Sequence, residues 1–297
     1  MFAHLTSQLS SELRTVRKVL SISDRLRDLL ITQRAPLSKL PAELPNEADE
    51  NVKAAHELSR LIPEAPERLD WQIYDHCAAL TRIYAAYERF VSDLVAEYLG
   101  LLPRLYAMYS DLPPSITRQH RLGIGHILQK MSDKGPYKKL EEHVVVGQLA
   151  TGLSGAQGYN LVLDAFFIDR QNLRFRTLTN LFALLGFKSC DNYINKHPTL
   201  TEFMRQERAE GSSTEKELQD FVEYRNEAAH RNVENLLSKD QIGAISRFID
   251  ALGITLADMV EETVLERHMT LGHYSAVLTI CETHYDGHVV IGTPIGA

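Results

Sequence analysis

The sequence predicts a mainly α protein, built as a helical bundle with additional N-terminal helices and a short C-terminal β hairpin. Glycine and proline are scarce, at 16 and 11 of the 297 residues, so long helices are seldom interrupted. Apolar side chains recur three and four residues apart through most of the chain, which is the spacing of one face of an α-helix. Alternation and a turn signal typical of β-strands occur near the C-terminus.

The helices follow from this spacing in chain order. We expect two N-terminal helices over residues 5–31 and 46–61, separated by a proline-bearing stretch. The longest helix is expected over 69–102, with Pro103 marking its end or a kink, because proline has no amide hydrogen to donate within a helix. Later helices are predicted by the same spacing over 111–131, 137–152, 171–185, 191–209, 215–231 and 239–267.

Two of these segments carry additional signals. The run Val144–Val146 is also compatible with a strand, because β-branched residues favour strands. A local break is expected at His197–Pro198, since a proline displaces the residue before it from helical geometry.

The C-terminal tail predicts a β hairpin. His273–Ile280 and His288–Ile291 have strand-like composition, and Asp286–Gly287 between them is a hairpin turn signal. Because two strands do not form a stable domain alone, we expect either a β element packed on the helices or a truncated second domain. The expected division is an N-terminal helical extension, a helical domain and this tail, over residues 1–68, 69–267 and 268–297.

The charge balance limits how the protein can bind nucleic acid. The net charge is −7, from 32 basic and 39 acidic side chains. Proteins that coat nucleic acid nonspecifically are usually basic, so a nucleic-acid site on this chain must be local. The same acidic balance disfavours binding to an anionic membrane surface.

Several classes of site and location are disfavoured by the residue pattern. The three cysteines are far apart and form no CxxC pair, so we expect reduced thiols in a cytoplasmic protein, without a disulfide framework or a zinc site. No apolar stretch of about 18 residues predicts a membrane span, and the N-terminus does not resemble a signal peptide. The histidines lack metal-ligand spacing, and no nucleotide-binding or hydrolase motif is present. We therefore predict no metal and no cofactor.

The predicted helix 215–231 carries an arginine in an apolar position. Leu218, Phe221 and Val222 stand at positions i, i+3 and i+4 of an apolar stripe. Arg225 follows at i+7, where the periodicity favours a hydrophobic residue. Burying a guanidinium without a partner is costly, so Arg225 requires an explanation beyond packing.

The polar residues around Arg225 do not share one helix face. Asn226 and His230 are four residues apart and project ~40° apart on an ideal helix. Arg225 and His230 are five apart and diverge by ~140°. These two side chains converge only if the helix ends or bends near His230, or if a second copy of the helix contributes its own pair.

This segment resembles the HEPN superfamily, whose signature is an Arg and a His separated by four to six residues, often with Asn directly after the Arg. The run Arg225–His230 fits that signature and lies on a late helix, as in the superfamily. The run Leu80–Phe90 is similar to the first core helix of the RiboL-PSP-HEPN branch, which is found near bacterial defence and toxin genes. The resemblance covers about residues 70–267 and implies a HEPN-like helical bundle.

What the resemblance implies is metal-independent endoribonuclease activity, with Arg225, His230 and Asn226 as catalytic residues. In the family the histidine activates the ribose 2′-hydroxyl, which attacks the adjacent phosphate and leaves a 2′,3′-cyclic phosphate and a 5′-hydroxyl. The residue types suit this chemistry. Histidine titrates near neutrality, and arginine presents a planar, permanently charged fork to phosphate.

The resemblance also implies partners. Family members usually act as homodimers with two Arg/His pairs facing one cleft, where Arg231 would add positive charge for an RNA substrate. Glu88 either orients Arg225 or is a solvated helix charge. An antitoxin or a defence complex is a further expected partner. Toxins of the superfamily that are modified by nucleotidyltransferase antitoxins carry a tyrosine two residues after the histidine, whereas this chain has Asn232, which disfavours that form of neutralisation.

The same residues also have non-catalytic interpretations. Arg225 and His230 could serve as cations near a helix C-terminus, where they interact favourably with the last carbonyl groups. The chain could equally be a non-catalytic HEPN module that binds RNA, nucleotide or a partner protein in a defence assembly. Tyr84, Tyr87 and Tyr98 are expected in the core or at an interface instead of stacking on bases.

Overall fold

The computed structural model describes residues 1–37, 49–131, 137–168, 172–208, 211–230, 233, 235–272, 278–284 and 289–294. The predicted fold class is confirmed, because helices account for most of this part of the chain. None of the helices in the described part of the chain is both long enough and apolar enough to cross a membrane.

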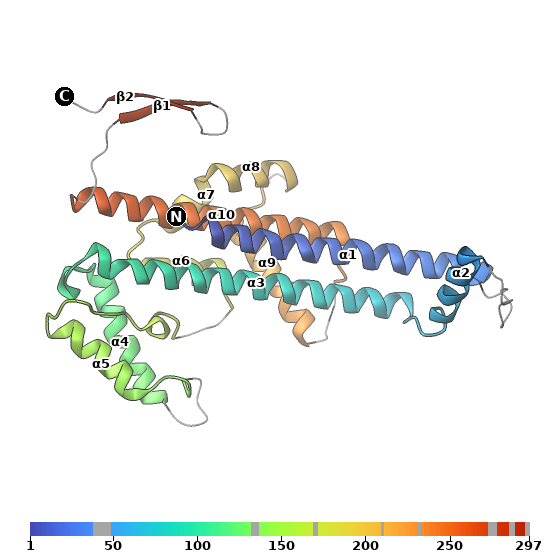
Figure 1. Cartoon of the computed structure of the whole chain (residues 1–297), viewed down its shortest axis with the longest axis horizontal. Coiled ribbons are helices and arrows are strands. Elements are labelled where there is room, and N and C mark those ends of the chain that lie inside the picture. Colours follow the sequence, from blue (N-terminus) through green and yellow to red (C-terminus); the bar gives the residue numbers. More distant parts are fainter. Residues whose placement is uncertain are drawn as a thin grey trace.

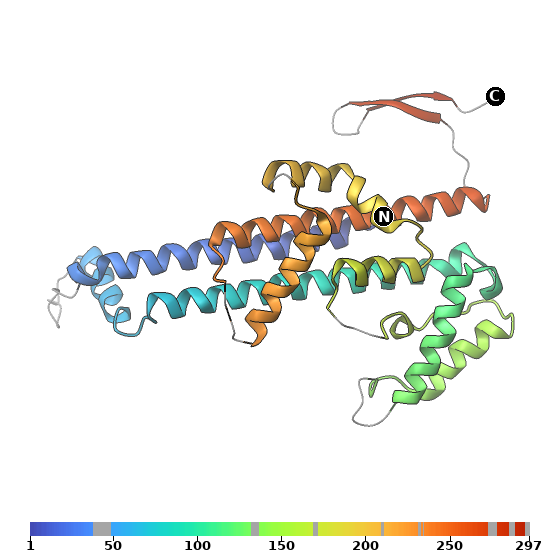
Figure 2. The same ribbon diagram turned by 180° about the vertical axis from the view of Figure 1, so that it is seen from behind.

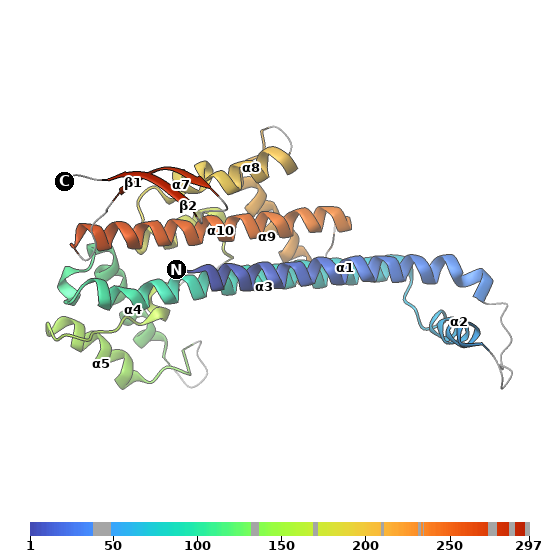
Figure 3. The same ribbon diagram turned by 45° about the horizontal axis from the view of Figure 1, so that its top comes forward.

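Three long helices run side by side along the molecule (Figures 1 and 3). They are α1 (Ala3–Leu37), α3 (Arg68–Leu105) and α10 (Lys239–Thr270). Each buries an apolar stripe with helical spacing against the other two, so α1 shares one core with the later helices. Burial of these stripes stabilises the bundle by roughly 25 cal/mol per Å² of apolar surface removed from water.

The central helix α3 is buried along most of its length. Its stripe includes Leu80, Tyr87 and Leu94, each fully buried. The Tyr87 hydroxyl donates a 3.2 Å hydrogen bond to the carbonyl oxygen of Leu173, so this phenol is satisfied within the core. Pro103 lies inside the helix, two residues before its end at Leu105.

Shorter helices cover the ends and one side of the three long ones. α4 and α5 extend away from the bundle beside the C-terminal end of α3 (Figures 1 and 2). Val144–Val146 is helical, so the strand alternative for this run is wrong. The break at His197–Pro198 is confirmed, since α7 ends just before it and Pro198 begins α8. The shorter elements are α2 (Glu50–Leu61), η1 (Tyr109–Asp111), α4 (Pro114–Lys130), α5 (Glu142–Leu153), η2 (Leu163–Phe166), α6 (Phe175–Leu184), α7 (Cys190–Lys196), α8 (Pro198–Glu207) and α9 (Thr214–His230).

The C-terminal hairpin is present as an antiparallel pair, β1 (Leu278–His284) and β2 (Val289–Pro294). Both strands extend further along the chain than the sequence pattern indicated. The predicted turn at Asp286–Gly287 and the start of the predicted first strand, 273–277, lie outside the described residues.

A close approach between α4 and η2 is made possible by a glycine. A Cβ atom at Gly123 would overlap the carbonyl oxygen of Ala165, so a larger residue would push η2 away from α4. His120, one turn earlier, is fully buried and joins the same elements. Its Nε2 accepts a 3.0 Å hydrogen bond from the Val162 amide, and its Nδ1 lies 3.0 Å from the Tyr109 hydroxyl. These partners satisfy a neutral imidazole with its proton on Nδ1.

Acidification is expected to destabilise the protein through His120. Burial lowers the pKa of His120 from 6.5 to about 4, so the unfolded chain binds more protons between these values. The contribution of His120 to the free energy of unfolding is therefore fully present above pH 6.5. It is lost as the pH drops towards 4, by roughly 3 kcal/mol in total. Urea unfolding of wild type between pH 7 and 5 measures this slope.

In the variant His120→Gln, the free energy of unfolding should depend less steeply on pH over the same interval. The difference corresponds to about one proton fewer taken up on unfolding. His143→Gln, at an exposed position on α5, is the matched control and should keep the wild-type slope. A His120→Gln protein with the wild-type pH slope would contradict this assignment, whatever its absolute stability.

Candidate functional site

The helix that carries the Arg225–His230 motif is anchored at its N-terminal end. Ser213 caps α9, because its Oγ accepts a 3.2 Å hydrogen bond from the Lys216 amide. Ser212 and Glu215 have the spacing of a capping box, but the cap lies one residue later, at Ser213. The Ser212 hydroxyl instead donates to Glu217, whose carboxylate also pairs with Arg208 at 2.6 Å. These contacts hold the start of α9 against the end of α8.

Helix α9 crosses α3 (Figure 2), and its apolar stripe is buried. Leu218, Phe221 and Val222 are fully buried, as the spacing predicted. Arg225, the next position of the stripe, is half-buried at the edge of the same contact. The structure thus places this guanidinium between the core and solvent.

Arg225 stacks on an aromatic ring of α3. The centre of its guanidinium lies 3.6 Å from the ring centroid of Tyr84, which is a cation–π contact at close range. The ring is held in place, since Tyr84 is buried and its hydroxyl accepts a 3.0 Å hydrogen bond from the Leu173 amide. Burial raises the pKa of the Tyr84 hydroxyl, so Tyr84 remains a neutral phenol. This contact explains why an arginine occupies an apolar position of α9.

The polar neighbours of Arg225 leave its charge unneutralised. Its Nη1 donates a 3.0 Å hydrogen bond to the Oδ1 of Asn226, which is half-buried beside it. No carboxylate among the described residues forms an ion pair with Arg225. Glu88, considered from the sequence as its orienting carboxylate, forms no hydrogen bond or ion pair with it among the described residues. It lies one turn beyond Tyr84 on α3 and lines a separate cavity. The guanidinium therefore keeps N–H donors available for an anion.

His230 is separated from Arg225 within one protomer. It is the last residue of α9 and is exposed, whereas Arg225 faces α3. This arrangement agrees with the ~140° between the two positions on an ideal helix. Arg231 and Asn232 lie outside the described residues.

A comparison with models of protein families finds a match over most of the chain. The model of the RiboL-PSP-HEPN family matches residues 49–262, a span that contains both Tyr84 and the whole of α9. This chain is a member of the RiboL-PSP-HEPN family. Neither a curated protein nor a solved structure shows significant similarity to the chain. HEPN domains often dimerise and bind RNA, and many of them are ribonucleases.

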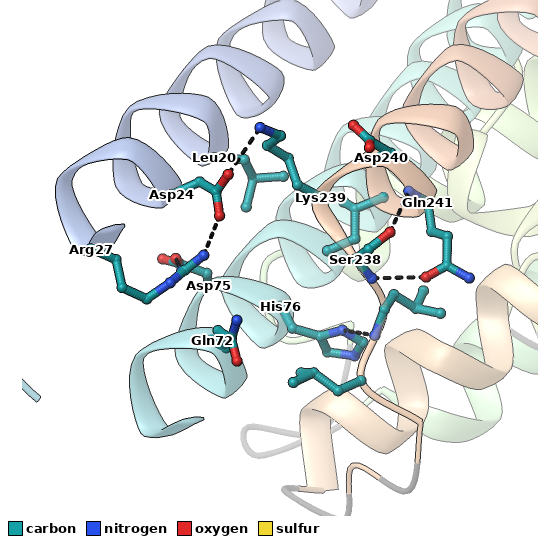
Figure 4. A pocket seen from close by; sticks show the side chains of 13 residues that line it. Leu20, Asp24, Arg27, Gln72, Asp75, His76, Ser238, Lys239, Asp240 and Gln241 are labelled. Atoms are coloured by element: carbon teal, nitrogen blue, oxygen red, sulfur yellow. Dashed lines mark hydrogen bonds and ion pairs between the residues drawn. The ribbon is translucent and has the colours of Figure 1, made fainter. Parts of the chain in front are cut away.

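In this RiboL-PSP-HEPN chain, Leu237, just before α10, is held against α3 (Figure 4). The Leu237 amide donates a 3.1 Å hydrogen bond to Nδ1 of His76, a fully buried residue of α3. Burial lowers the pKa of His76, which keeps the imidazole neutral and able to accept this bond. Ser238 and Gln241 then form a capping box that begins α10. The start of α10 is thereby fixed relative to α3.

Four charged residues near the start of α10 are paired with one another. They line a cavity of about 460 Å³ between α1, α3 and the start of α10 (Figure 4). Asp24 pairs with Arg27 and with Lys239, the latter at 2.9 Å, and Asp75 pairs with Arg27 at 2.9 Å. In the part of the chain that the structure describes, no three His, Cys, Asp or Glu side chains come together in a way that could hold a metal ion.

Two residues of this region were missed by reasoning from the sequence. Tyr84 was assigned to the core or an interface, and its contact with Arg225 was not foreseen. His76 was not singled out. A polar or aromatic side chain within the apolar stripe of the longest helix was the available signal for both, because such a residue needs a partner from another segment.

Proposed function

We propose that this protein is a metal-independent endoribonuclease of the HEPN type. The observation that carries the proposal is the guanidinium of Arg225, which is held on the Tyr84 ring and left without a carboxylate partner among the described residues. A preorganised, unneutralised guanidinium at a protein surface is suited to bind a phosphodiester and to stabilise the charge that develops on it.

His230 would supply the acid–base chemistry. Its imidazole is exposed at the end of α9, where it can reach a substrate. In the proposed reaction it takes the proton of a ribose 2′-hydroxyl while the 2′-oxygen attacks the adjacent phosphorus. The bond from phosphorus to the 5′-oxygen breaks, and that oxygen takes up a proton. The products are a 2′,3′-cyclic phosphate and a 5′-hydroxyl, with no net change in protons.

The working site is proposed to be composite. Within one protomer, Arg225 faces α3 while His230 is exposed at the helix end, so one copy of α9 does not bring both to the same phosphate. A two-fold dimer that places two α9 helices side by side would bring Arg225 of one copy to His230 of the other. Asn226, bonded to Arg225, would help to orient the phosphate. Local concentration of positive charge at this seam would let an acidic protein bind RNA.

The biological role proposed is that of a toxin or an antiviral effector acting on host or phage RNA, in line with the branch to which the chain belongs. The alternative is a non-catalytic HEPN module that binds RNA, nucleotide or a partner protein. Catalysis is the only one of these functions that requires His230 to be exposed next to a second copy of Arg225.

Removing divalent metal ions is expected to leave RNA cleavage unchanged. The purified protein is incubated with a mixed-sequence RNA in EDTA and in Mg²⁺, and the product ends are analysed. We expect equal rates, with 2′,3′-cyclic phosphate and 5′-hydroxyl ends, because the proposed groups are all side chains. Cleavage that EDTA abolishes would indicate a metal-dependent nuclease, and no cleavage in either condition would favour the binding module.

A further inference from the structure

A second cavity lies close to the Arg225–Tyr84 contact. It measures about 750 Å³ and opens between α3, α4, η2 and α6. Its apolar lining includes Phe166 and Leu173, both buried. Leu173 also links the cavity to the proposed active site, because its amide donates to the hydroxyl of Tyr84, on which Arg225 stacks.

Polar groups without protein partners line this cavity. Glu88 is half-buried, and among the described residues its carboxylate has no hydrogen bond or ion pair. Nε2 of His126 is inaccessible to solvent and likewise has no hydrogen-bond partner. The two groups differ in access, because the Glu88 carboxylate is only half-buried and open to the cavity, whereas Nε2 of His126 is buried. A ligand in the cavity could therefore bring hydrogen-bond donors to the Glu88 carboxylate, which has no partner among the described residues.

Glu88 on the cavity wall lies about one helical turn from Tyr84, on which Arg225 stacks. Glu88 follows Tyr84 by four residues, so both lie on the same face of α3, about one helical turn or ~5.4 Å apart. A phosphate bound by Arg225 above Tyr84 would therefore lie near the part of the cavity that Glu88 lines. The base of an adjacent nucleotide could enter it and place its faces against the apolar lining.

The Glu88 carboxylate, a hydrogen-bond acceptor, selects among the bases. The Watson–Crick edge of guanine presents two adjacent donors, the ring N–H and the exocyclic amine, which a carboxylate can accept together. Adenine and cytosine each present one amine beside an acceptor nitrogen, which a carboxylate repels. Uracil presents one N–H between two carbonyl acceptors. Glu88 is therefore matched to guanine.

We propose that this cavity binds a guanine base next to the phosphodiester held by Arg225, with Glu88 as the residue that determines base specificity. The location next to a cleaved bond rests on the proposed ribonuclease function. The binding of the base itself does not, since it depends on Glu88 and the cavity alone.

Binding of a mononucleotide tests the site independently of cleavage. GMP and AMP are titrated into the full-length protein by calorimetry, with wild type, Glu88→Gln and Glu97→Gln compared. Glu97 lies on the same helix in an exposed ion pair with His4, so its replacement controls for the lost charge. We expect wild type and Glu97→Gln to bind GMP more tightly than AMP, and Glu88→Gln to lose about tenfold or more in affinity for GMP.

Cleavage of a randomised RNA then locates the base. We expect wild type to cut with guanine at one fixed position beside the broken bond, and Glu88→Gln to lose that preference. Equal affinity for GMP and AMP, or equal GMP affinity in the two variants, would overturn the guanine site. Cleavage without base preference would overturn the placement of this site beside the cleaved bond while leaving the ribonuclease proposal standing. Selective GMP binding without any cleavage would support the guanine site and contradict the ribonuclease proposal.

Discussion

Replacing His230 with alanine is expected to slow RNA cleavage by about 10²–10⁴-fold, which is the usual contribution of a general acid–base group. The side chain is exposed at the end of α9, so its removal leaves no cavity in the core. Thermal unfolding of the variant should therefore match wild type. The rate is measured under single-turnover conditions with the protein in excess over RNA, so that the chemical step is observed instead of product release.

The matched control for this variant is His143→Ala. His143 is also an exposed histidine, on α5, and lies outside the proposed site. We expect it to cleave RNA at the wild-type rate. A His230→Ala protein that is as fast as the control would remove His230 from the mechanism and favour the non-catalytic module.

Mixing two inactive variants is expected to restore cleavage. In a site built across a two-fold axis, Arg225→Ala lacks the arginine of both sites, and His230→Ala lacks the histidine of both. A heterodimer of the two carries one site with neither residue and one site with both. Half of randomly assorted dimers are heterodimers with one intact site, so we expect about a quarter of the wild-type rate. The measurement is cleavage after the two proteins are unfolded together and refolded, or after co-expression with different tags.

Two controls make the mixing experiment decisive. Either single variant mixed with the double variant Arg225→Ala/His230→Ala should stay inactive, because no dimer then contains an intact pair. Isolation of the two-tag species establishes that heterodimers have formed. Purified heterodimers without activity would show that Arg225 and His230 act within one protomer, which would require a conformation of α9 other than the one described here.

Most of the fold could be predicted from local patterns. The apolar spacing of Leu218, Phe221 and Val222 predicted a buried stripe on α9, and all three are fully buried. Spacing works here because it depends only on the 3.6-residue period of the helix. It was less accurate at ends, as at the cap of α9, where Ser212 and Ser213 are chemically alike and only the backbone geometry selects Ser213.

Part of the candidate site could likewise be predicted from the sequence, and part could not. The sequence by itself determined the motif, Arg225 with Asn226 and His230, and showed that the first and last of these diverge around the helix axis. The tertiary structure alone decided what surrounds Arg225. It supplied the ring of Tyr84 from α3 and directed Glu88 into a separate cavity.

The physical reason is that such contacts join segments far apart in the chain. Leu237 and His76 are 161 positions apart yet share a hydrogen bond, and Tyr84 reaches Arg225 only because α9 crosses α3. Periodicity reports which face of a helix is apolar, but not which residue of another helix will lie against it. The sequence therefore determined that Arg225 needed a partner at the edge of the core. Packing of α9 on α3 decided that this partner is an aromatic ring, which leaves the positive charge free.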